Sequence, residues 1–150
     1  TGDGRTNESE HPSTPADQLI STSRMTGEPH GEVSADIWFR SSLPYADVFV
    51  RLCDVDPAGR AWNVCDGLVS LTDADETQCA TVQLWPTAYR FKRGHRIRVQ
   101  VSSGAFPRYA RNPGTGVPRA TATVLLAADQ TVHHDREHPS AIILPTRTQN

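Results

Sequence analysis

The chain has 150 residues, of which 37% are apolar and 21% are charged, and its formal net charge at pH 7 is -2. A chain of this length buries roughly 70% of the surface that its unfolded form exposes, so it can build a core without disulfide or metal support. No apolar run approaches the roughly 20 residues of a membrane-spanning helix. We therefore expect a single globular domain with no membrane partner.

The start of the chain and its cysteines indicate its origin and its cellular compartment. The chain starts at Thr1 and its only methionine is Met25, so we expect a segment that was processed or excised from something longer. Cys53, Cys65 and Cys79 cannot all pair within one chain, and each lies in an apolar or alternating stretch. That pattern favours reduced core thiols over a secreted disulfide framework, and hence a cytoplasmic protein.

Residues 1–17 are almost devoid of large apolar groups, which predicts a linker that is disordered or lies along the surface. From Val33 the pattern has period two, with apolar side chains on one face of a strand over 33–40. The alternation returns over 48–53 and ends at the sequence Asp-Pro-Ala-Gly of residues 56–59. Proline and glycine in these places predict a hairpin turn.

Further short stretches read as strands, and none shows an apolar stripe at helical spacing. They are 60–65, 67–72, 77–85, 96–103, 120–127, 130–134 and 140–144. Short β-branched strands separated by turn signals predict an all-β sandwich or barrel. We expect this domain to span 18–146, followed by a tail over 147–150. Residues 104–119 contain three prolines and three glycines, which predicts a surface loop.

Basic residues cluster in one stretch, because no acid occurs between Glu76 and Asp129. The basic residues there are Arg90, Lys92, Arg93, Arg96, Arg98, Arg108, Arg111 and Arg119, interleaved with Tyr89, Phe91, Phe106 and Tyr109. Such surfaces can bind single-stranded nucleic acid. However, seven acids between Asp47 and Glu76 can neutralise this face. We therefore expect a solvated or domain-contacting face and no nucleic-acid partner.

A second polar cluster contains His133, His134, Asp135 and His138, whose imidazole and carboxylate groups are ligands that zinc accepts. On a strand, however, His133 and His134 point to opposite faces, and the spacing matches no known zinc motif. We therefore expect a polar strand end that runs into a turn, and no metal site.

Signals of catalysis are also missing. Ser102 and Ser103 precede Gly104, but no G-x-S-x-G elbow is present, and neither Gly2-Asp3-Gly4 nor Gly114-Thr115-Gly116 precedes a helix as a phosphate-binding loop would. The cysteines lie in strand-like runs, where burial raises the thiol pKa. We predict no catalytic residue and no cofactor.

Residues 47–67 and 94–116, with His138-Pro139-Ser140 and Leu144-Pro145, resemble the C-terminal domain of the cocaine esterase and X-prolyl dipeptidyl-peptidase (CocE/NonD) family of serine hydrolases. The resemblance runs from about Gln18 to about Thr146. It implies a jelly-roll β-sandwich of the galactose-binding-like class, packed against an α/β-hydrolase catalytic domain. The family's Ser, Asp and His catalytic residues lie in that other domain, and none maps onto this chain.

The expected function is therefore that of a non-catalytic domain of an ester- or X-Pro-amide-cleaving hydrolase. Its expected contact is the loop that carries Phe106, Arg108, Tyr109 and Arg111, whose guanidinium groups suit carboxylates on a hydrolase domain of the same or a second polypeptide. The same features would also serve a loop that folds back on its own sandwich.

Two alternatives stay open. A free-standing carbohydrate- or ligand-binding module would stack its ligand on aromatic side chains, for which the candidates are Trp38, Trp62, Trp85, Tyr89 and Tyr109. An assembly domain would bind another chain, such as a second copy in a homo-oligomer, through an exposed edge or the basic face.

Overall fold

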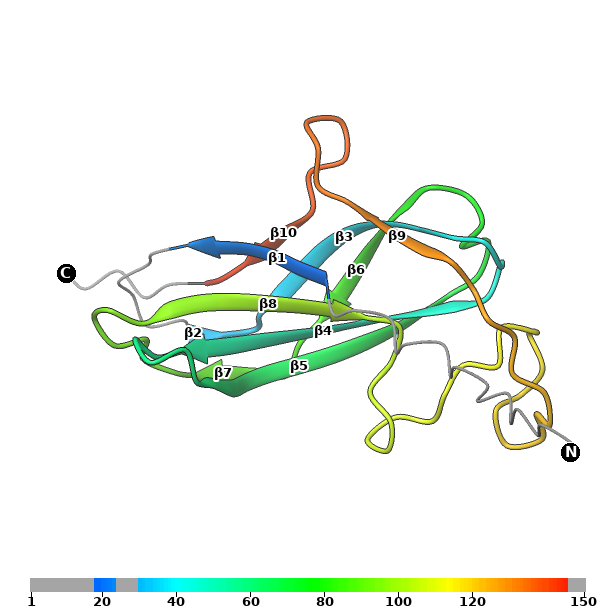
Figure 1. Ribbon diagram of the computed structural model, residues 1–150, viewed down its shortest axis with the longest axis horizontal. Helices are drawn as coiled ribbons and strands as arrows, with labels where there is room; N and C mark the ends of the chain where they lie inside the picture. The colour runs from blue at the N-terminus through cyan, green and yellow to red at the C-terminus, as the bar shows by residue number, and fades with distance from the viewer. Residues whose placement is uncertain (1–17, 24–29, 146–150) are drawn as a thin grey trace, which may run out of the picture.

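The computed structural model describes residues 18–23 and 30–145, and every regular element in these ranges is a β-strand (Figure 1). The strands are β1 (Gln18–Ser23), β2 (His30–Gly31), β3 (Ser34–Ser41), β4 (Ala46–Val55), β5 (Ala61–Leu71), β6 (Gln78–Gln83), β7 (Thr87–Ala88), β8 (Arg96–Ser102), β9 (Gln130–His133) and β10 (Ala141–Ile143). The predicted linker and tail lie outside the described residues. The described part has no helix that is long and apolar enough to cross a membrane.

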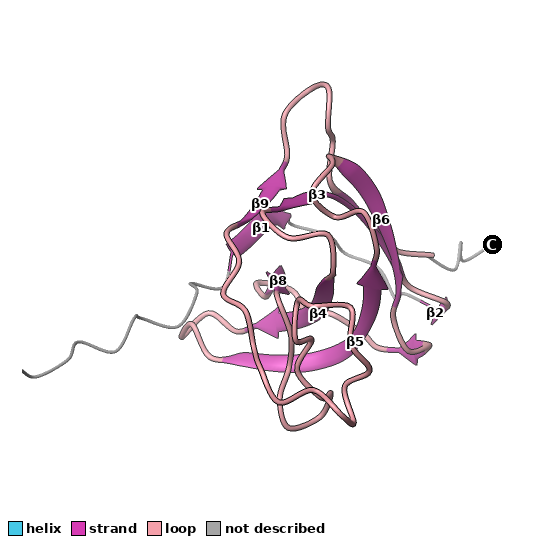
Figure 2. Cartoon of the chain, turned by 90° about the vertical axis from the view of Figure 1, so that its right-hand side faces the viewer, coloured by secondary structure: helices cyan, strands magenta, loops and turns pink. Residues whose placement is uncertain are grey.

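The strands form two antiparallel layers. One sheet has the order β1-β8-β4-β5, and the other has the order β10-β3-β6, with β9 also paired to β3. Figure 2 shows the two layers facing each other, with the long loop that follows β8 at the near end. This is the all-β sandwich that the spacing of the strands predicts. The short strands β2 and β7 pair with each other.

The core lies between the layers and follows the predicted alternation. On β3, Ala35, Ile37 and Phe39 are buried, while their neighbours face outward. Strand β8 buries every second residue in the same way. Strand β4 differs from β3 and β8, because side chains on both of its faces are buried. It lies in the middle of its sheet, between β8 and β5. Its outer face must therefore be covered by something other than the second sheet.

Strand β5 corrects one prediction. The sequence predicts two strands, 60–65 and 67–72, but the structure has one strand that pairs with β4 along its whole length. Gly67 does not make a turn. A Cβ atom placed on it would lie 2.1 Å from the backbone oxygen of Gln83, so the glycine allows β5 to approach the end of β6 closely.

Other predictions divide into confirmed and wrong. The hairpin turn is confirmed: Gly59 has a φ of 86° and donates its N–H to the Asp56 oxygen at 3.0 Å. The strand predicted over 120–127 is wrong, because this stretch is exposed and pairs with no sheet. Cys79 is also exposed, whereas Cys53 and Cys65 are buried as predicted, and none of the three forms a disulfide within the described residues.

Candidate interdomain surface

The loop 103–129 joins β8 to β9 and covers the outer face of β4 and β5. Val48, Val50 and Leu52 of β4 point into the core, so Asp47 and Phe49, at the alternate positions, face outward. The pairing register sets Asp47 opposite Ser70 of β5. Side chains of the loop contact these outward residues: Arg119 contacts Asp47, and Tyr109 contacts Phe49.

Asp47 anchors the second half of the loop. Its side chain is only 1% exposed, and Arg119 Nη2 lies 2.7 Å from its Oδ1 atom. Arg119 also donates to Ser70 Oγ at 2.7 Å, and Asn112 Nδ2 donates to Asp47 Oδ1 at 2.8 Å. Two loop residues 7 positions apart thus converge on one buried carboxylate. Because a buried charge is costly without such partners, these contacts fix the loop to the sheet.

Asp66 anchors the first half of the loop. Arg108 Nη2 forms an ion pair with Asp66 Oδ1 at 2.9 Å, and Asn63 Nδ2 donates to the other carboxylate oxygen at 3.0 Å. The Tyr109 ring lies 6.0 Å from the ring of Phe49, measured between centroids. Arg108, 51% exposed, and Tyr109 therefore turn toward their own sandwich. These ion pairs also confirm, for Arg108 and Arg119, that acids of 47–76 neutralise the basic stretch.

Phe106 and Arg111, the other two predicted contact residues, face outward. Phe106 is 65% exposed, and the Arg111 guanidinium carbon lies 4.8 Å from the centre of its ring. Trp85 is 64% exposed at the end of β6. A shallow hollow of about 420 Å³ lies beside Trp85 and reaches Tyr109; it is lined by Glu32, Gly67, Leu68, Gln83, Leu84, Trp85, Pro86 and Tyr109.

We call Phe106, Tyr109, Arg111 and Trp85, together with this hollow, the interdomain patch. It combines exposed aromatic rings with one outward guanidinium group, the composition that is enriched at protein interfaces. Sequence reasoning did not place Trp85 beside the loop, because the two meet through β5: Trp85 donates its N–H to the Asp66 carbonyl oxygen, and the Asp66 side chain pairs with Arg108.

The hydrogen bonds give no support for catalysis by this surface. Within 18–23 and 30–145, no serine side chain hydrogen-bonds a histidine ring; Ser102 Oγ donates to the Gly104 oxygen instead. Burial raises the pKa of the Cys65 thiol to about 11, and burial together with Asp36 also raises the pKa of Cys79. Both thiols are therefore protonated at neutral pH and are poor nucleophiles.

The proposed aromatic platform does not assemble either. Tyr89 packs against Phe91 and donates its hydroxyl to Asp54, whereas Trp38 contacts His138. Among the described residues, no ring contact joins two of the five candidate aromatics. The five rings therefore form no continuous stacking platform, although Trp85 and Tyr109 both line the shallow hollow.

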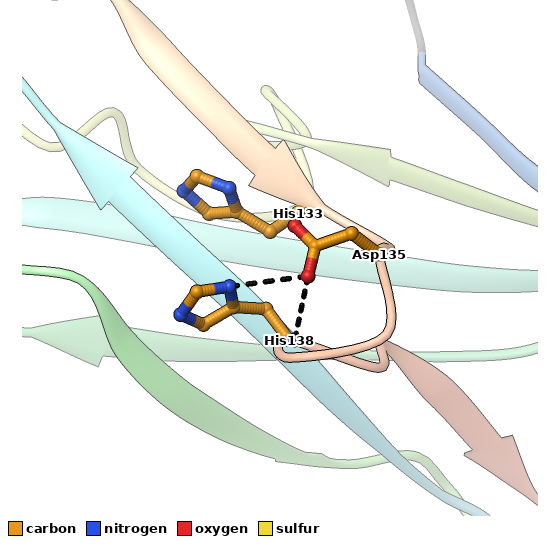
Figure 3. A group of neighbouring side chains, drawn as sticks. All are labelled: His133, Asp135 and His138. Atoms are coloured by element: carbon orange, nitrogen blue, oxygen red, sulfur yellow. Dashed lines mark hydrogen bonds and ion pairs between the residues drawn. The ribbon is translucent and has the colours of Figure 1, made fainter.

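The histidine cluster differs from its expected form. His134 is exposed and lies apart, as the alternation predicts, but the turn after β9 brings His133, Asp135 and His138 together (Figure 3). Their possible ligand atoms lie within 4.8 Å of one another. Sequence reasoning compared the two adjacent histidines and missed this grouping, which depends on the return of the chain.

Comparison with known proteins identifies the family of this sandwich. Residues 28–143 match the family described as the X-Pro dipeptidyl-peptidase C-terminal non-catalytic domain. Cocaine esterase of Rhodococcus sp. (strain MB1 Bresler) is 38% identical in an alignment of 128 positions, which covers 77% of this chain and 22% of that protein. The chain thus spans about a fifth of the curated relative that it matches.

Solved structures agree with the sequence match. An α-amino acid ester hydrolase has a TM-score of 0.77 at 26% identity and is covered over 26% of its chain, with 89% of this chain aligned. An aminopeptidase from a marine sediment Thaumarchaeota archaeon shares the fold with a TM-score of 0.76 at 24% identity, over 88% of this chain and 25% of that one. The matched family covers most of the described sandwich, so the chain belongs to the C-terminal non-catalytic domains of the X-Pro dipeptidyl-peptidase family.

Proposed function

We propose that this domain supports an α/β-hydrolase catalytic domain, of the same or a second polypeptide, in a serine hydrolase that cleaves esters or X-Pro amides. The main observation behind the proposal is the interdomain patch, where Phe106 and Trp85 are exposed and Trp85 and Tyr109 line a shallow hollow. Exposed aromatic groups that gather around a hollow mark interaction sites more often than solvated surface.

The loop geometry supports a contact of fixed shape. Asp47 and Asp66 hold the loop from below, so Phe106 and Arg111 are presented by an anchored segment. The Phe106 ring beneath the guanidinium aligns Arg111, which then offers its planar donors to a carboxylate on the partner domain. A pre-organised contact of this kind loses little entropy on binding.

The relatives support the reaction class. They are a cocaine esterase, an aminopeptidase and an α-amino acid ester hydrolase. Esters and amides are cleaved by serine hydrolases through an acyl-enzyme, with a histidine as general base and an oxyanion hole. In this proposal all of these groups belong to the catalytic domain, and the sandwich contributes stability and shape. The three cysteines that form no disulfide among the described residues favour a cytoplasmic location for the whole protein.

A chimaera tests the proposal. The corresponding domain of Rhodococcus cocaine esterase is replaced by this chain, and ester hydrolysis and the melting temperature are measured. We expect an active, cooperatively melting enzyme. The Phe106→Ala/Arg111→Ala variant should lower the melting temperature by several degrees, whereas Arg136→Ala, at an exposed position on another loop, should not.

Two outcomes would overturn the proposal. One is a chimaera whose melting temperature is unchanged by the double substitution. The other is saturable ester hydrolysis by the isolated chain that a serine-reactive inhibitor abolishes. Dimerisation of the isolated chain that is lost in the double variant would instead assign the patch to a homo-oligomer.

A further inference from the structure

The segment between β9 and β10 leaves and rejoins the same sheet edge. Both strands pair with β3, with His133 opposite Trp38 and Ala141 opposite Asp36. Residues 134–140 therefore form an excursion between two nearly adjacent positions of one edge, and Figure 1 shows it projecting from the sandwich. Its base is narrow, so side chains at the two ends of the excursion lie close together.

Three metal-ligating side chains meet at this base (Figure 3). His133 is the last residue of β9, and Asp135 and His138 belong to the excursion. His138 Nδ1 lies 3.3 Å from Asp135 Oδ1, and the two imidazole rings are 5.1 Å apart between centroids. Each residue offers a ligand atom within 4.8 Å of the other two.

The surrounding contacts hold these side chains in place. Ser140 Oγ donates to the His133 carbonyl oxygen and accepts the Trp38 N–H, which ties both sides of the base to β3. The His138 and Trp38 rings pack edge to face, with 5.0 Å between their centroids. Asp135 Oδ1 accepts the N–H groups of Glu137 and His138, each at 2.8 Å. The cluster is thus built on a strand and a closed turn, as a pre-organised site requires.

An ordinary ion pair leaves part of this arrangement unexplained. The His138–Asp135 contact uses one imidazole nitrogen and one carboxylate oxygen. His133 Nε2 is buried and has no hydrogen-bond partner among the described residues. Native proteins rarely leave a buried polar atom unsatisfied without a water molecule, an ion or a functional reason. A cation bound by the three side chains would be coordinated by nitrogen and oxygen lone pairs that make no other hydrogen bond among the described residues.

We propose that His133, Asp135 and His138 bind one divalent transition-metal ion, with Zn²⁺ as the best fit. Two imidazoles and a carboxylate with an open fourth position for water form a common zinc donor set. Ligand atoms of a tetrahedral zinc lie about 3.3 Å apart, given Zn–N and Zn–O lengths of about 2.0–2.1 Å. Small side-chain rotations bring the three groups to that spacing. The bound ion closes the base of the excursion and links β9 to the turn before β10.

Titration of the full chain with ZnCl2 tests this proposal. The chain carries Cys79→Ser, so that its exposed thiol cannot bind the ion, and is stripped of metal with a chelator. Calorimetry should give one ion per chain with a dissociation constant of about 1 μM or tighter. Excess Zn²⁺ should raise the melting temperature by about 5 °C, because the ion binds the folded state.

Three variants locate the site. His138→Asn and Asp135→Asn should each weaken Zn²⁺ binding by at least about tenfold. The asparagine at 135 keeps an oxygen that can accept the two backbone N–H groups, so it removes the charge while retaining the turn. His134→Asn is the matched control, because His134 is exposed and outside the cluster, and it should bind Zn²⁺ within about twofold of the parent chain.

The proposal fails if the parent chain binds no zinc below about 1 mM. It also fails if Asp135→Asn binds as tightly as the parent, or if His134→Asn weakens binding as much as His138→Asn. Circular dichroism of the metal-free variants checks their folding. If His138→Asn does not fold, the comparison of Asp135→Asn with His134→Asn decides the outcome.

Discussion

The two ends of β4 solve the same physical problem with different chemistry. Asp47 at the start and Asp54 near the end are both buried, with side chains 1% and 2% exposed. Asp47 faces Arg119, which is permanently charged. Asp54 accepts the Tyr89 hydroxyl at 2.7 Å, and His95 Nδ1 lies 2.9 Å from its other oxygen.

The difference shows how one strand can hold two loops through contacts that respond differently to pH. A guanidinium group keeps its charge at every pH at which the protein folds, so Arg119 stays a charged partner of Asp47. The phenol at Asp54 can lose its proton, and the phenolate would then repel the carboxylate. The long loop is thus held by a partner of fixed charge, and the segment before β8 by titratable ones.

The largest expected effect comes from Arg119→Ala. This change leaves the Asp47 carboxylate buried with only Asn112 as its partner, and the free energy of unfolding should fall by about 3 kcal/mol. Urea unfolding measures the loss. Arg136→Ala, an exposed arginine, serves as the control and should change stability by less than about 0.5 kcal/mol. Equal effects of the two substitutions would show that the Asp47 anchor contributes nothing.

Tyr89→Phe should have a smaller effect. It removes one hydrogen bond to the Asp54 carboxylate and leaves the His95 contact, so we expect a loss of about 1.5 kcal/mol in the free energy of unfolding. The same urea experiment applies. Tyr45→Phe removes a hydroxyl from a more exposed ring and should be close to neutral. A neutral Tyr89→Phe would contradict the role given to this contact.

The titration of Tyr89 tests whether the contact at Asp54 depends on pH. The hydrogen bond to Asp54, with burial, raises the pKa of Tyr89 to about 12. Because the folded value lies above the ordinary value near 10, its stabilising effect is complete below about pH 10 and is lost as the pH approaches 12. Tyrosinate absorbance of the wild type minus that of Tyr89→Phe should show this late step. A difference curve with its midpoint near 10 would refute the prediction.

The smallest effect concerns Asp56, two residues beyond Asp54. Burial acts to raise the pKa of this carboxyl, but the Arg60 backbone N–H and side chain outweigh it, so the net pKa lies below the usual 3.8. Its contribution to stability is therefore present above about pH 4 and is lost as the pH falls below the folded pKa. The amide resonance of Arg60, followed by NMR, should titrate with a midpoint below 3.8. A midpoint at or above that value would refute the assignment.

The alternation of apolar and polar residues predicted much of the fold, because a strand that is buried on one face has an apolar residue at every second position. The strand over 33–40 and the strand over 96–103 appear as β3 and β8 within one or two residues. Strand β1 was not predicted as a strand, since Gln18–Ser23 is short and largely polar. Its pairing with β8 depends on a distant edge, which local pattern does not report.

The wrong predictions share a cause, which is that local pattern does not identify the partner. Residues 120–127 have suitable strand residues but meet no free sheet edge; near their end, Leu126 donates its N–H to the Pro113 oxygen of the same loop. Cys79 alternates correctly, but the buried face of β6 carries Ala80 and Val82. Gly67 resembles a turn residue, although its role is the close approach to Gln83.

The candidate sites were predicted only in part. The loop residues Phe106 and Arg111 face outward, and the charge pattern predicted that acids of 47–76 neutralise the basic stretch, but it did not identify Asp47 and Asp66 as the residues that hold the loop. An acid inside an apolar strand is the available signal, since a buried carboxylate requires a partner. The interdomain role of the four loop residues stays a prediction.

The excursion between β9 and β10 also has a practical consequence for engineering. Because it departs from and returns to one edge of β3, added residues between Arg136 and Glu137 would lengthen an exposed loop and leave every strand register intact. Such exposed loop tips tolerate insertions well. This position is therefore a suitable place to introduce a fluorescent label or an affinity peptide while the interdomain patch remains unaltered, but the insertion separates Asp135 from the Glu137 and His138 N–H groups and so disrupts the proposed zinc site.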